Sequence, residues 1–400
     1  MMKILWITPY LGSSYGGTTQ VVLELAKTLG GNIHLDLITT DANGSDKLAY
    51  PLELWIDREN YRIQYFPSWH RNDLIFSPSL INWLFNHVSS YDIVHTHTIF
   101  APLISISHRI CKAKNIPYIM TPHGMLEPWA LAYKAWKKRI YYTLWEKFFL
   151  QQASAIQVLA QSEANSIKSL GLNQPVVVIP NGIHPDEFQS LPNPEIFYQN
   201  FPNTRNKTII LFLGRIDPKK GLDLLAPAFA KVHNHFPQTH LIVAGPDNIG
   251  FLSTARSYFA KAGCIDEVTF TGMLTDSLKY SALAAASLYV APSYSEGFSM
   301  SVLEGMASGL PSIITTGCNF PEAAHAKAAY VVSLDSDAIA NALLESLKNP
   351  QQAKEMGNRA INFICQNYTW EQAAKRLIEV YTAIAESKPL PDYLNYTGLT

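Results

Sequence analysis

Short apolar segments alternate with helical patterns twice along the chain. In the first half, runs of aliphatic and β-branched residues predict strands at 3–8 (KILWIT), 34–40 (HLDLITT), 62–67, 92–97, 117–122, 155–160 and 176–180. Several of these runs are separated by stretches whose apolar residues recur at helical spacing. Alternating strands and helices form parallel sheets with helices on both faces, so the pattern predicts a doubly wound α/β fold.

The alternation restarts after a stretch rich in proline and asparagine, residues 188–207. Strands are predicted at 208–214, 240–245, 268–272, 288–292, 312–316 and 330–333, and the last 50 residues have only helical patterns, with Leu377, Val380, Tyr381 and Ile384 at helical spacing. We therefore expect a Rossmann-like domain at 1–187, a linker at 188–207, a second Rossmann-like domain at 208–370 and a C-terminal helix at 371–400.

Composition agrees with two globular domains and limits the possible partners. A chain of 400 residues with 48% hydrophobic residues exceeds what one core usually serves. Its formal net charge of -1 predicts no nucleic-acid partner. The cysteines are scattered and none forms a C-x-x-C pair, and no apolar run approaches the roughly 18 residues of a membrane span. We expect a cytoplasmic protein without disulfides or a zinc site.

Ligands of open α/β sheets bind beyond the carboxyl ends of the strands, so the loops after strands are the candidate sites. Gly16 and Gly17 follow the first strand and precede a helix expected near Thr18. Backbone amides without side chains at a helix N-terminus suit an anion. The alternative is a tight turn in which Thr18 caps the helix.

Two cations follow the first strand of the second half. Arg215 and Lys220 flank a proline turn. Gly221 opens a helix whose apolar residues are spaced so that one face can be buried. A forked guanidinium and a mobile ammonium suit a diphosphate, and each pairing at about 4 Å has roughly 4 kcal/mol of gross Coulomb energy at an effective dielectric near 20. The alternative is a pair of solvated surface cations.

Two glutamates, Glu296 and Glu304, lie around a helix that the pattern starts at 299–301 and ends at Gly309. Eight helical residues span about 12 Å, too far for a two-carboxylate acid/base pair. We expect Glu296 in the loop and Glu304 one turn inside the helix, with the backbone amides of Phe298, Ser299 and Met300 offered to phosphate. The alternative is a capping box from Ser301 to Glu304.

Histidines follow two strands of the first half. His123 lies after a strand and before a glycine, where a histidine can act in chemistry or satisfy a backbone carbonyl. We expect His95 and His97 to point to opposite faces of their strand, which makes them poor joint metal ligands, and His97 to line the ligand cleft.

One helical segment, residues 127–152, combines basic and aromatic positions. Its stripe of Lys134, Lys138, Tyr141 and Trp145 lies beside an apolar face of Tyr133, Trp136, Ile140 and Leu144. This pattern is compatible with peripheral contact to a membrane that carries a lipid-linked substrate. The alternative is a packed helix whose lysines extend from its rim.

The segment PSYSEGFSMSVLEGMASGLP (292–311), with its two glutamates separated by seven residues, resembles the signature of retaining GT-B glycosyltransferases of family four (group 1), which use nucleotide sugars. The Gly16-Gly17 loop and the segments TPHG, VIPNGI, GRIDPKKG, VAGP and YTWEQAAKRLIEVY agree in order. The resemblance covers nearly the whole chain and is strongest to bacterial, including cyanobacterial, members of exopolysaccharide assembly. Two positions depart from it, His184 and Ser299, where aspartate and glycine are usual.

The resemblance implies two Rossmann-like domains facing across a cleft, with the final helix returning to the first domain. It assigns Arg215 and Lys220 to the donor diphosphate, Glu304 to the ribose, Glu296 to the sugar hydroxyls and His123 to the sugar and acceptor. Gly245 and Met273 belong to the donor side in the same way, Met273 at the base. It further implies retention of configuration without a metal or cofactor, because the leaving phosphate accepts the acceptor's proton. UDP-glucose is the expected donor, and a glycan or lipid-linked sugar at the inner face of the plasma membrane is the expected acceptor.

Two other functions fit the same plan. A UDP-sugar epimerase would share the two domains, and a non-catalytic protein could bind the nucleotide sugar without transferring it. The turn with Arg215 and Lys220 beside the paired glutamates favours transfer over epimerisation. The presence of His123 with both cations argues against a catalytically silent module.

Overall fold

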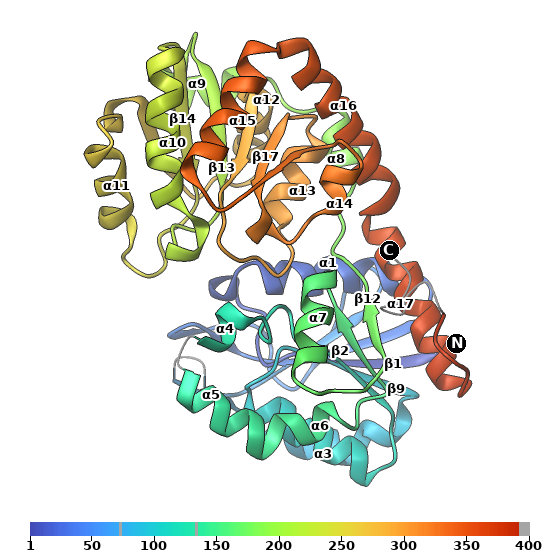
Figure 1. Ribbon diagram of the computed structural model, residues 1–400. Helices are drawn as coiled ribbons and strands as arrows, with labels where there is room; N and C mark the ends of the chain where they lie inside the picture. Colours follow the sequence, from blue (N-terminus) through green and yellow to red (C-terminus); the bar gives the residue numbers. More distant parts are fainter. Residues whose placement is uncertain (72–73, 133–134, 392–400) are drawn as a thin grey trace. The chain divides into compact units, whose positions relative to one another are not determined.

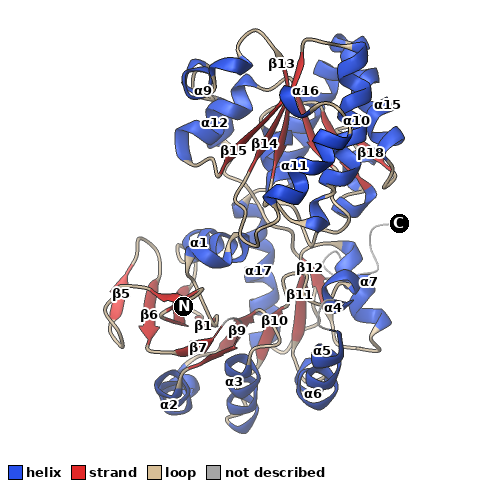
Figure 2. Ribbon diagram, turned by 90° about the vertical axis from the view of Figure 1, so that its left-hand side faces the viewer, coloured by secondary structure: helices blue, strands red, loops and turns tan. Residues whose placement is uncertain are grey.

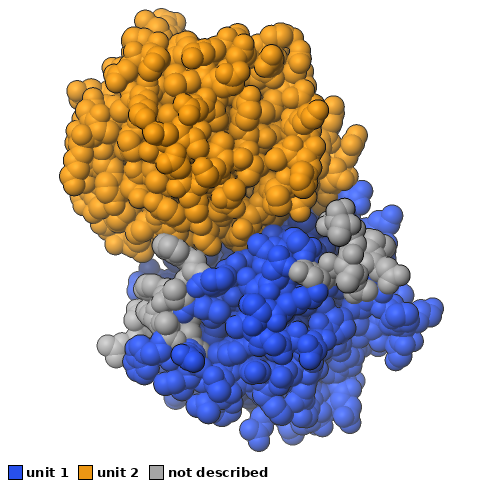
Figure 3. Space-filling model, viewed as in Figure 1, with its two compact units in different colours: residues 1–181, 370–400 blue, residues 182–369 orange. Residues whose placement is uncertain are grey.

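A computed structural model describes residues 1–71, 74–132 and 135–391, and the chain divides into two compact units. Unit 1 comprises Met1–Asn181 and Trp370–Thr400, and unit 2 comprises Gly182–Thr369 (Figure 3). The last helix, α17 (Trp370–Ala385), therefore belongs to the first unit. Among the described residues, no helix is both long and apolar enough to cross a membrane.

Unit 1 is built on an eight-stranded sheet in the order β12-β11-β10-β9-β1-β2-β6-β5. The strands are β1 (Lys3–Ile7), β2 (His34–Thr40), β5 (Trp55–Asp57), β6 (Arg62–Phe66), β9 (Ile93–His97), β10 (Tyr118–Thr121), β11 (Ala155–Val158) and β12 (Val176–Val178). All neighbours run parallel except β5, which is antiparallel to β6 at the edge. The central strands are buried along nearly their whole length, as expected for a sheet covered on both faces.

Helices cover both faces of this sheet. Figure 2 shows α2 (Pro78–His87), α3 (Pro102–Ala113), α5 (Ala135–Tyr141) and α6 (Lys147–Leu150) along one face. The other helices are α1 (Gly17–Leu29), α4 (Pro128–Ala132) and α7 (Gln161–Ser169), and α1 packs against α17. In α17, Leu377, Val380 and Tyr381 are buried, as their helical spacing predicts, while Ile384 is only partly buried. Two hairpins, β3–β4 (Ala42–Asn43, Asp46–Lys47) and β7–β8 (Trp69–Arg71, Leu74–Phe76), lie outside the main sheet.

Unit 2 contains an all-parallel six-stranded sheet in the order β15-β14-β13-β16-β17-β18 (Figure 1). Its strands are β13 (Thr208–Leu213), β14 (Thr239–Ala244), β15 (Val268–Gly272), β16 (Leu288–Ala291), β17 (Ser312–Thr315) and β18 (Tyr330–Val332). Its longer helices are α10 (Leu222–His235), α11 (Leu252–Lys261), α12 (Asp276–Ala285), α13 (Met300–Ala307), α15 (Ser336–Lys348) and α16 (Pro350–Asn367). The predicted doubly wound α/β class is therefore confirmed in both units.

Residues 188–207 are folded into unit 2, which differs from the expected linker. They contain part of α8 (Asp186–Gln189), α9 (Glu195–Asn200) and a short 3-10 turn (Pro202–Thr204), and α9 packs on α12. The Phe197 ring is buried in the hydrophobic core, and its backbone amide donates to Ser281 Oγ at 2.9 Å. Prolines and asparagines marked helix ends here, because proline suits a first turn and asparagine a turn.

Each sheet has one point where the strand order reverses. In unit 1 the chain passes from β1 to β2 on one side and later to β9 on the other. In unit 2 the same reversal separates β13 from β16. Adjacent loops leave the sheet in opposite directions at such a point, which opens a crevice at the carboxyl ends of the strands.

Candidate functional site

The turn after β13 is pressed against the loop after β16, at the reversal point of unit 2. Gly221 has φ 70°, and a Cβ on it would lie 2.0 Å from the Pro292 carbonyl oxygen. Only glycine fits both the left-handed conformation and this close approach. Asp217 caps the turn by accepting from the Lys219 amide at 3.0 Å. The result is that Lys220, at the end of this turn, faces the segment that follows β16.

Lys220 and Glu296 form a buried ion pair at this point. Lys220 Nζ donates to Glu296 Oε1 at 2.5 Å, and Ser293 Oγ donates to the same oxygen at 2.6 Å. The two charged residues are only 9% and 7% exposed. Burial would raise the pKa of Glu296, but the charges of Lys220 and Lys219 and the hydrogen bonds from Lys220 and Ser293 hold it below its ordinary value. Glu296 is therefore ionised in this pair.

The backbone of Glu296 is fixed as firmly as its side chain. Its amide donates to the Gly317 carbonyl at 2.8 Å, and its own carbonyl accepts from Asn319 Nδ2 at 2.6 Å. Both partners follow β17, and a Cβ on Gly317 would lie 2.2 Å from the Ser293 carbonyl oxygen. The sequence reasoning missed Ser293, Gly317 and Asn319. Their position directly after strands β16 and β17 was the available signal.

Glu304 lies in the second turn of α13 and Glu296 in the loop before it, as expected. Glu304 Oε1 accepts from Lys279 Nζ of α12 at 3.0 Å. The capping-box alternative is wrong, because the N-cap residue is Ser299, which makes no side-chain cap bond, and Ser301 Oγ instead accepts from Tyr289 OH at 3.0 Å. Glu304 is thus free of any helix-capping task.

The N-terminus of α13 is anchored by the ring of Phe298. This ring stacks on Tyr368 at 5.7 Å and meets Phe320 edge-on at 5.5 Å. The Phe298 side chain is therefore committed to packing, so its predicted ligand contact rests on the backbone amide. Ser299 and Met300 follow it directly and begin the helix, which places their amides at the positive helix end.

The remaining donor-side residues lie on neighbouring strand exits. Arg215 is exposed and makes no hydrogen bond or ion pair with any residue in the described part of the chain. Gly245 has φ 154°, and a Cβ there would lie 1.9 Å from the Gly214 carbonyl oxygen, so it keeps the β13 and β14 exits close. Met273, just after β15, is 67% exposed. Burial lowers the pKa of Lys219, a third cation in the turn.

In the described part of the chain, no side chain or backbone packs against the Cβ positions of the glycine turn of unit 1, Gly16 and Gly17. Gly16 has φ 69° and is the N-cap of α1, which begins at Gly17. The alternative with Thr18 as cap is therefore wrong. A Cβ built on either glycine meets no atom within 4 Å. Internal packing therefore does not require glycine at 17, and a helix N-terminus of this kind suits an anion.

His123 lies directly after β10 in a left-handed conformation, with φ 52°. Its Nε2 lies 3.1 Å from His97 Nδ1, so its ring pairs with another histidine and not with a backbone carbonyl. Glu163 holds the same turn, because it accepts from the Gly124 amide at 2.5 Å and from the Leu159 amide at 3.0 Å. Burial raises the pKa of Glu163 to about 7.

His95 and His97 lie on the same face of β9, and the expectation of opposite faces was wrong. Their rings stack with centroids 4.6 Å apart. Successive strand residues alternate between faces, so residues two apart share one. No group of three potential ligands suited to a metal occurs within residues 1–71, 74–132 and 135–391. Burial lowers the pKa of His95 to about 3 and that of His123 to about 4, which leaves both rings neutral near pH 7.

Comparisons with known proteins place the chain in a family. A model described as glycosyl transferases group 1 matches residues 195–363, and one described as Glycosyltransferase Family 4 matches residues 15–187. The two matches together cover most of the chain. It belongs to the group 1 glycosyltransferases and has the GT-B fold.

Particular relatives agree along the whole length. The phosphatidyl-myo-inositol mannosyltransferase of Mycobacterium tuberculosis is 26% identical over 96% of this chain and 98% of its own. The D-inositol 3-phosphate glycosyltransferase of Streptomyces griseus is 25% identical over 92% of this chain and 84% of its own. Among solved structures, sucrose-phosphate synthase from Thermosynechococcus elongatus has a TM-score of 0.76 at 20% identity, covering 96% of this chain and 100% of that one. Anabaena HepE in complex with UDP and glucose has a TM-score of 0.76 at 18% identity with the same coverage.

Proposed function

We propose that this glycosyltransferase transfers a sugar, with retention of configuration, from a UDP-sugar to a glycan or lipid-linked acceptor in surface polysaccharide assembly. UDP-glucose is the first donor to test, because the structural neighbour HepE has been crystallised with UDP-glucose. The observation that carries the proposal is the buried Lys220–Glu296 pair at the reversal point of the unit 2 sheet. A binding surface without chemistry has no need of two buried charges, which are costly to remove from water.

Lys220 is well placed to bind a diphosphate while staying paired. An ammonium group has three donors, and Glu296 takes one of them. The other two are available for phosphate oxygens, and Arg215 adds a forked donor from the same turn. The amides of Ser299 and Met300 at the start of α13 complete an anion site. These groups supply the charge stabilisation that a metal ion supplies in other enzymes, so we propose a reaction without a metal.

The two glutamates divide the donor between them. Glu304 keeps one oxygen on Lys279 and offers the other to the ribose hydroxyls. We assign Glu296, in the loop before the same helix, to the sugar hydroxyls. In unit 1, the amides of Gly16 and Gly17 at the start of α1 suit an anion, and the family resemblance assigns His123 to the sugar.

The proposed reaction needs no enzymatic base. The bond between the anomeric carbon and the phosphate oxygen breaks, and the acceptor oxygen bonds the same carbon on the same face. The acceptor's proton moves to the departing phosphate oxygen. The neutral state of His123, whose low pKa follows from burial, agrees with a role as a hydrogen-bond partner.

A panel of nucleotide sugars tests this function. The protein is incubated with UDP-, GDP- and ADP-sugars, with and without glycan acceptors, and the free nucleotide and the products are measured. We expect UDP release that depends on the acceptor and an α-linked product from an α-linked donor. Conversion of a UDP-sugar to its epimer without UDP release would favour the epimerase, and binding without turnover would favour the silent module.

A membrane contact is the second part of the proposal, and exposed side chains of unit 1 support it. Trp136, Ile140, Leu144, Trp145 and Phe148 are large apolar residues, each about half exposed or more, on α5, α6 and the π-helical turn Tyr142–Glu146 between them. These side chains are therefore not packed in the core of unit 1, although Phe149 and Leu150 of the same segment are buried. Tyr141 points inward instead and bonds Ser105 Oγ at 2.9 Å. Tyr133 and Lys134 of the predicted pattern lie outside the described residues.

The charge around this face fits an anionic lipid surface. Segments 78–87, 102–114 and 128–150 contain a single carboxylate, Glu146, and that carboxylate is buried. The same segments contain these cations: Arg109, Lys112, Lys114, Lys134, Lys137, Lys138, Arg139 and Lys147. Lys112 lies over the exposed Phe148 ring at 4.5 Å, and Lys114 lies over the exposed Phe85 ring at 4.2 Å. Aromatic rings beside cations on neighbouring helices are typical of a surface that lies in the lipid headgroup region.

Vesicle pelleting tests the contact with a matched control. Leu144→Glu and Leu54→Glu each place a carboxylate at an exposed leucine of unit 1, 66% and 63% exposed. We expect the protein to pellet with phosphatidylglycerol vesicles and not with phosphatidylcholine vesicles, and only Leu144→Glu to abolish pelleting. Equal pelleting of both variants would refute this surface as the contact.

A further inference from the structure

Three histidine rings in unit 1 form a continuous stack that ends at His123. His95 and His97 of β9 stack at 4.6 Å with 20° between their planes, and His97 and His123 stack at 5.3 Å with 29°. His95 and His97 are buried, whereas His123 is partly exposed. The stack therefore runs from the core of the sheet to the strand end where a ligand would arrive.

The buried end of the stack is held by α17. Trp6 Nε1 lies 2.8 Å from Tyr381 OH, and Tyr381 OH lies 2.6 Å from His95 Nδ1. An indole nitrogen can only donate, so the Tyr381 oxygen accepts from Trp6 and its own proton goes to His95 Nδ1. The neutral His95 ring then has its proton on Nε2, which donates to Thr121 Oγ1 at 2.7 Å. The tautomer of His95 is thus fixed by a residue 286 positions away.

The tautomers of His97 and His123, at the exposed end of the stack, follow from their hydrogen bonds in the same way. His97 has its Nδ1 3.1 Å from His123 Nε2, and its Nε2 is buried without a partner among the described residues. A buried N–H without an acceptor is rarer than a bare acceptor atom, so the His97 proton belongs on Nδ1. His97 then donates to His123 Nε2. A neutral His123 must in turn have its proton on Nδ1.

We propose that His97 is a positioning residue that makes His123 present its Nδ1–H as a hydrogen-bond donor, and that Tyr381 fixes the other end of the stack. The inference rests on the proposed function in one respect, the assignment of His123 to the sugar or acceptor. It goes further by naming the atom that acts and the direction of its hydrogen bond. The Nδ1–H of His123 would donate to an oxygen of the substrate, and His123 would not act as a base that takes a proton.

Two substitutions of His97 separate the hydrogen bond from the ring. His97→Phe keeps a stacked ring without the donor, and His97→Asn keeps an N–H near the position of Nδ1 without the ring. Supporting residues of this kind typically change activity 10- to 100-fold, so we expect His97→Phe to lower kcat by about that factor with a smaller change in KM. His97→Asn should recover most of the loss. Equal activity of both variants and the wild type, or equal losses in both, would overturn the donor role.

Tyrosine substitutions test the buried end. Tyr381→Phe removes one buried hydroxyl from the stack, and Tyr118→Phe removes another buried hydroxyl of unit 1, which donates to the Phe149 carbonyl at 2.6 Å. Tyr381→Phe should lose more stability than Tyr118→Phe, since it removes two hydrogen bonds and the control removes one. Only Tyr381→Phe should lower kcat. Equal kcat values in the two variants would remove Tyr381 from the inference.

Nitrogen NMR of the wild-type protein with labelled histidine decides the tautomer without any activity. We expect the His123 ring to be neutral with its proton on Nδ1, and that signal to change in His97→Phe but not in His97→Asn. A proton on His123 Nε2 in the wild type overturns the inference, even if the protein transfers sugar. A protein that turns over no nucleotide sugar would refute the proposed function alone, because the imidazole spectrum still decides this one.

Discussion

Both sheets bury titratable side chains where their strand order reverses, but those of unit 2 form an ion pair and those of unit 1 stay neutral. At the reversal point of unit 2, an ion pair is buried, and the charges of Lys220 and Lys219 hold the pKa of Glu296 below its ordinary value. At the reversal point of unit 1, titratable rings are buried and stay neutral, with the pKa of His95 lowered to about 3 and that of His123 to about 4. The first arrangement suits a phosphate, and the second suits uncharged hydroxyl groups. The difference supports our proposal that the cations of unit 2 bind the diphosphate of a nucleotide sugar.

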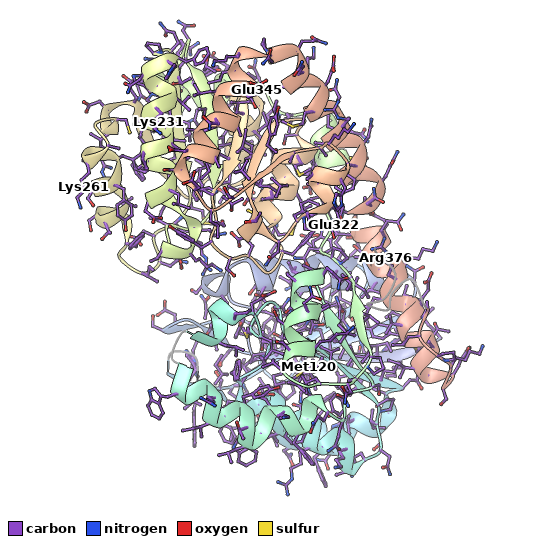
Figure 4. All side chains as sticks on the ribbon, in the orientation of Figure 1. Met120, Lys231, Lys261, Glu322, Glu345 and Arg376 are labelled. Carbon is purple, nitrogen blue, oxygen red and sulfur yellow. The ribbon has the colours of Figure 1, made fainter. Side chains whose placement is uncertain are left out.

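We expect the largest effect on activity from removing the Lys220 cation of unit 2. We expect Lys220→Ala to lower turnover by one to three orders of magnitude and to weaken UDP binding, because charge stabilisation at the leaving diphosphate is lost. Kinetics with the best nucleotide sugar and calorimetric UDP binding measure the two effects. Lys231→Ala is the control, since Lys231 is an exposed lysine of α10 in an ion pair with Asp337 (Figure 4). Wild-type turnover in Lys220→Ala would refute the diphosphate role.

Acidification separates the two units by their stability. Burial lowers the pKa of four histidines in unit 1, His95, His97, His108 and His123, and of one in unit 2, His240. The unfolded chain protonates these rings below about pH 6.5 while the folded chain does not, so the free energy of unfolding falls as pH drops from about 6.5 to 4. His95 and His123, whose pKa values are lowered to about 3 and about 4, contribute over most of this range.

Three carboxylates of unit 1 oppose this trend, since burial also raises the pKa of Glu127. Burial raises the pKa of Glu146 and Glu163 to about 7, so they stabilise the fold below about pH 4.5 and lose that effect as pH rises through 7. The histidines outnumber them, and unit 1 should still weaken first. Hydrogen exchange of β9 and β13 peptides, corrected for intrinsic rates, follows each unit separately. Unchanged protection of β9 between pH 6.5 and 4.5 would contradict the neutral stack.

The two glutamates sharpen the comparison within unit 2. We expect Glu304→Gln to weaken UDP binding about tenfold, because a charged hydrogen bond to the ribose is lost. Glu296→Gln should mainly lower kcat, and it should cost unit 2 about 3 kcal/mol of stability by leaving Lys220 buried without its counter-charge. UDP titrations and urea unfolding of both variants measure these effects. If Glu296→Gln weakened UDP as much as Glu304→Gln, the proposed division of the donor would be wrong.

The smallest effect concerns the glycine turn of unit 1. Gly17→Ala adds a methyl group into open space at the first residue of α1, so stability should stay equal or rise by up to about 1 kcal/mol. Donor KM should nevertheless rise severalfold if a phosphate approaches this helix end. Thermal unfolding and donor kinetics give the two numbers. An unchanged KM would mean that no phosphate approaches the start of α1, and that unit 1 binds only hydroxyl groups of the substrate.

The strands of both main sheets were predictable because each depends on its own run of apolar residues. The predicted strand at 34–40 matches β2, and that at 268–272 matches β15. The edge strand β5 and the small hairpins were missed, since strands of two or three residues have too few positions for a pattern. The prolines of residues 188–207 predict a linker, but the pattern does not show the burial of Phe197, which depends on α12.

The sequence by itself determined which residues end the strands, and so named Gly16, His123, Lys220 and Glu296 as candidates. Tertiary structure alone decided their partners. Lys220 meets Glu296 across 76 positions, because parallel strands bring distant loops to one edge of a sheet. Trp6 of β1 meets Tyr381 across 375 positions, because α17 belongs to the same compact unit as β1. Protonation was decided in the same way, since it depends on what surrounds a group and not on its neighbours in the chain.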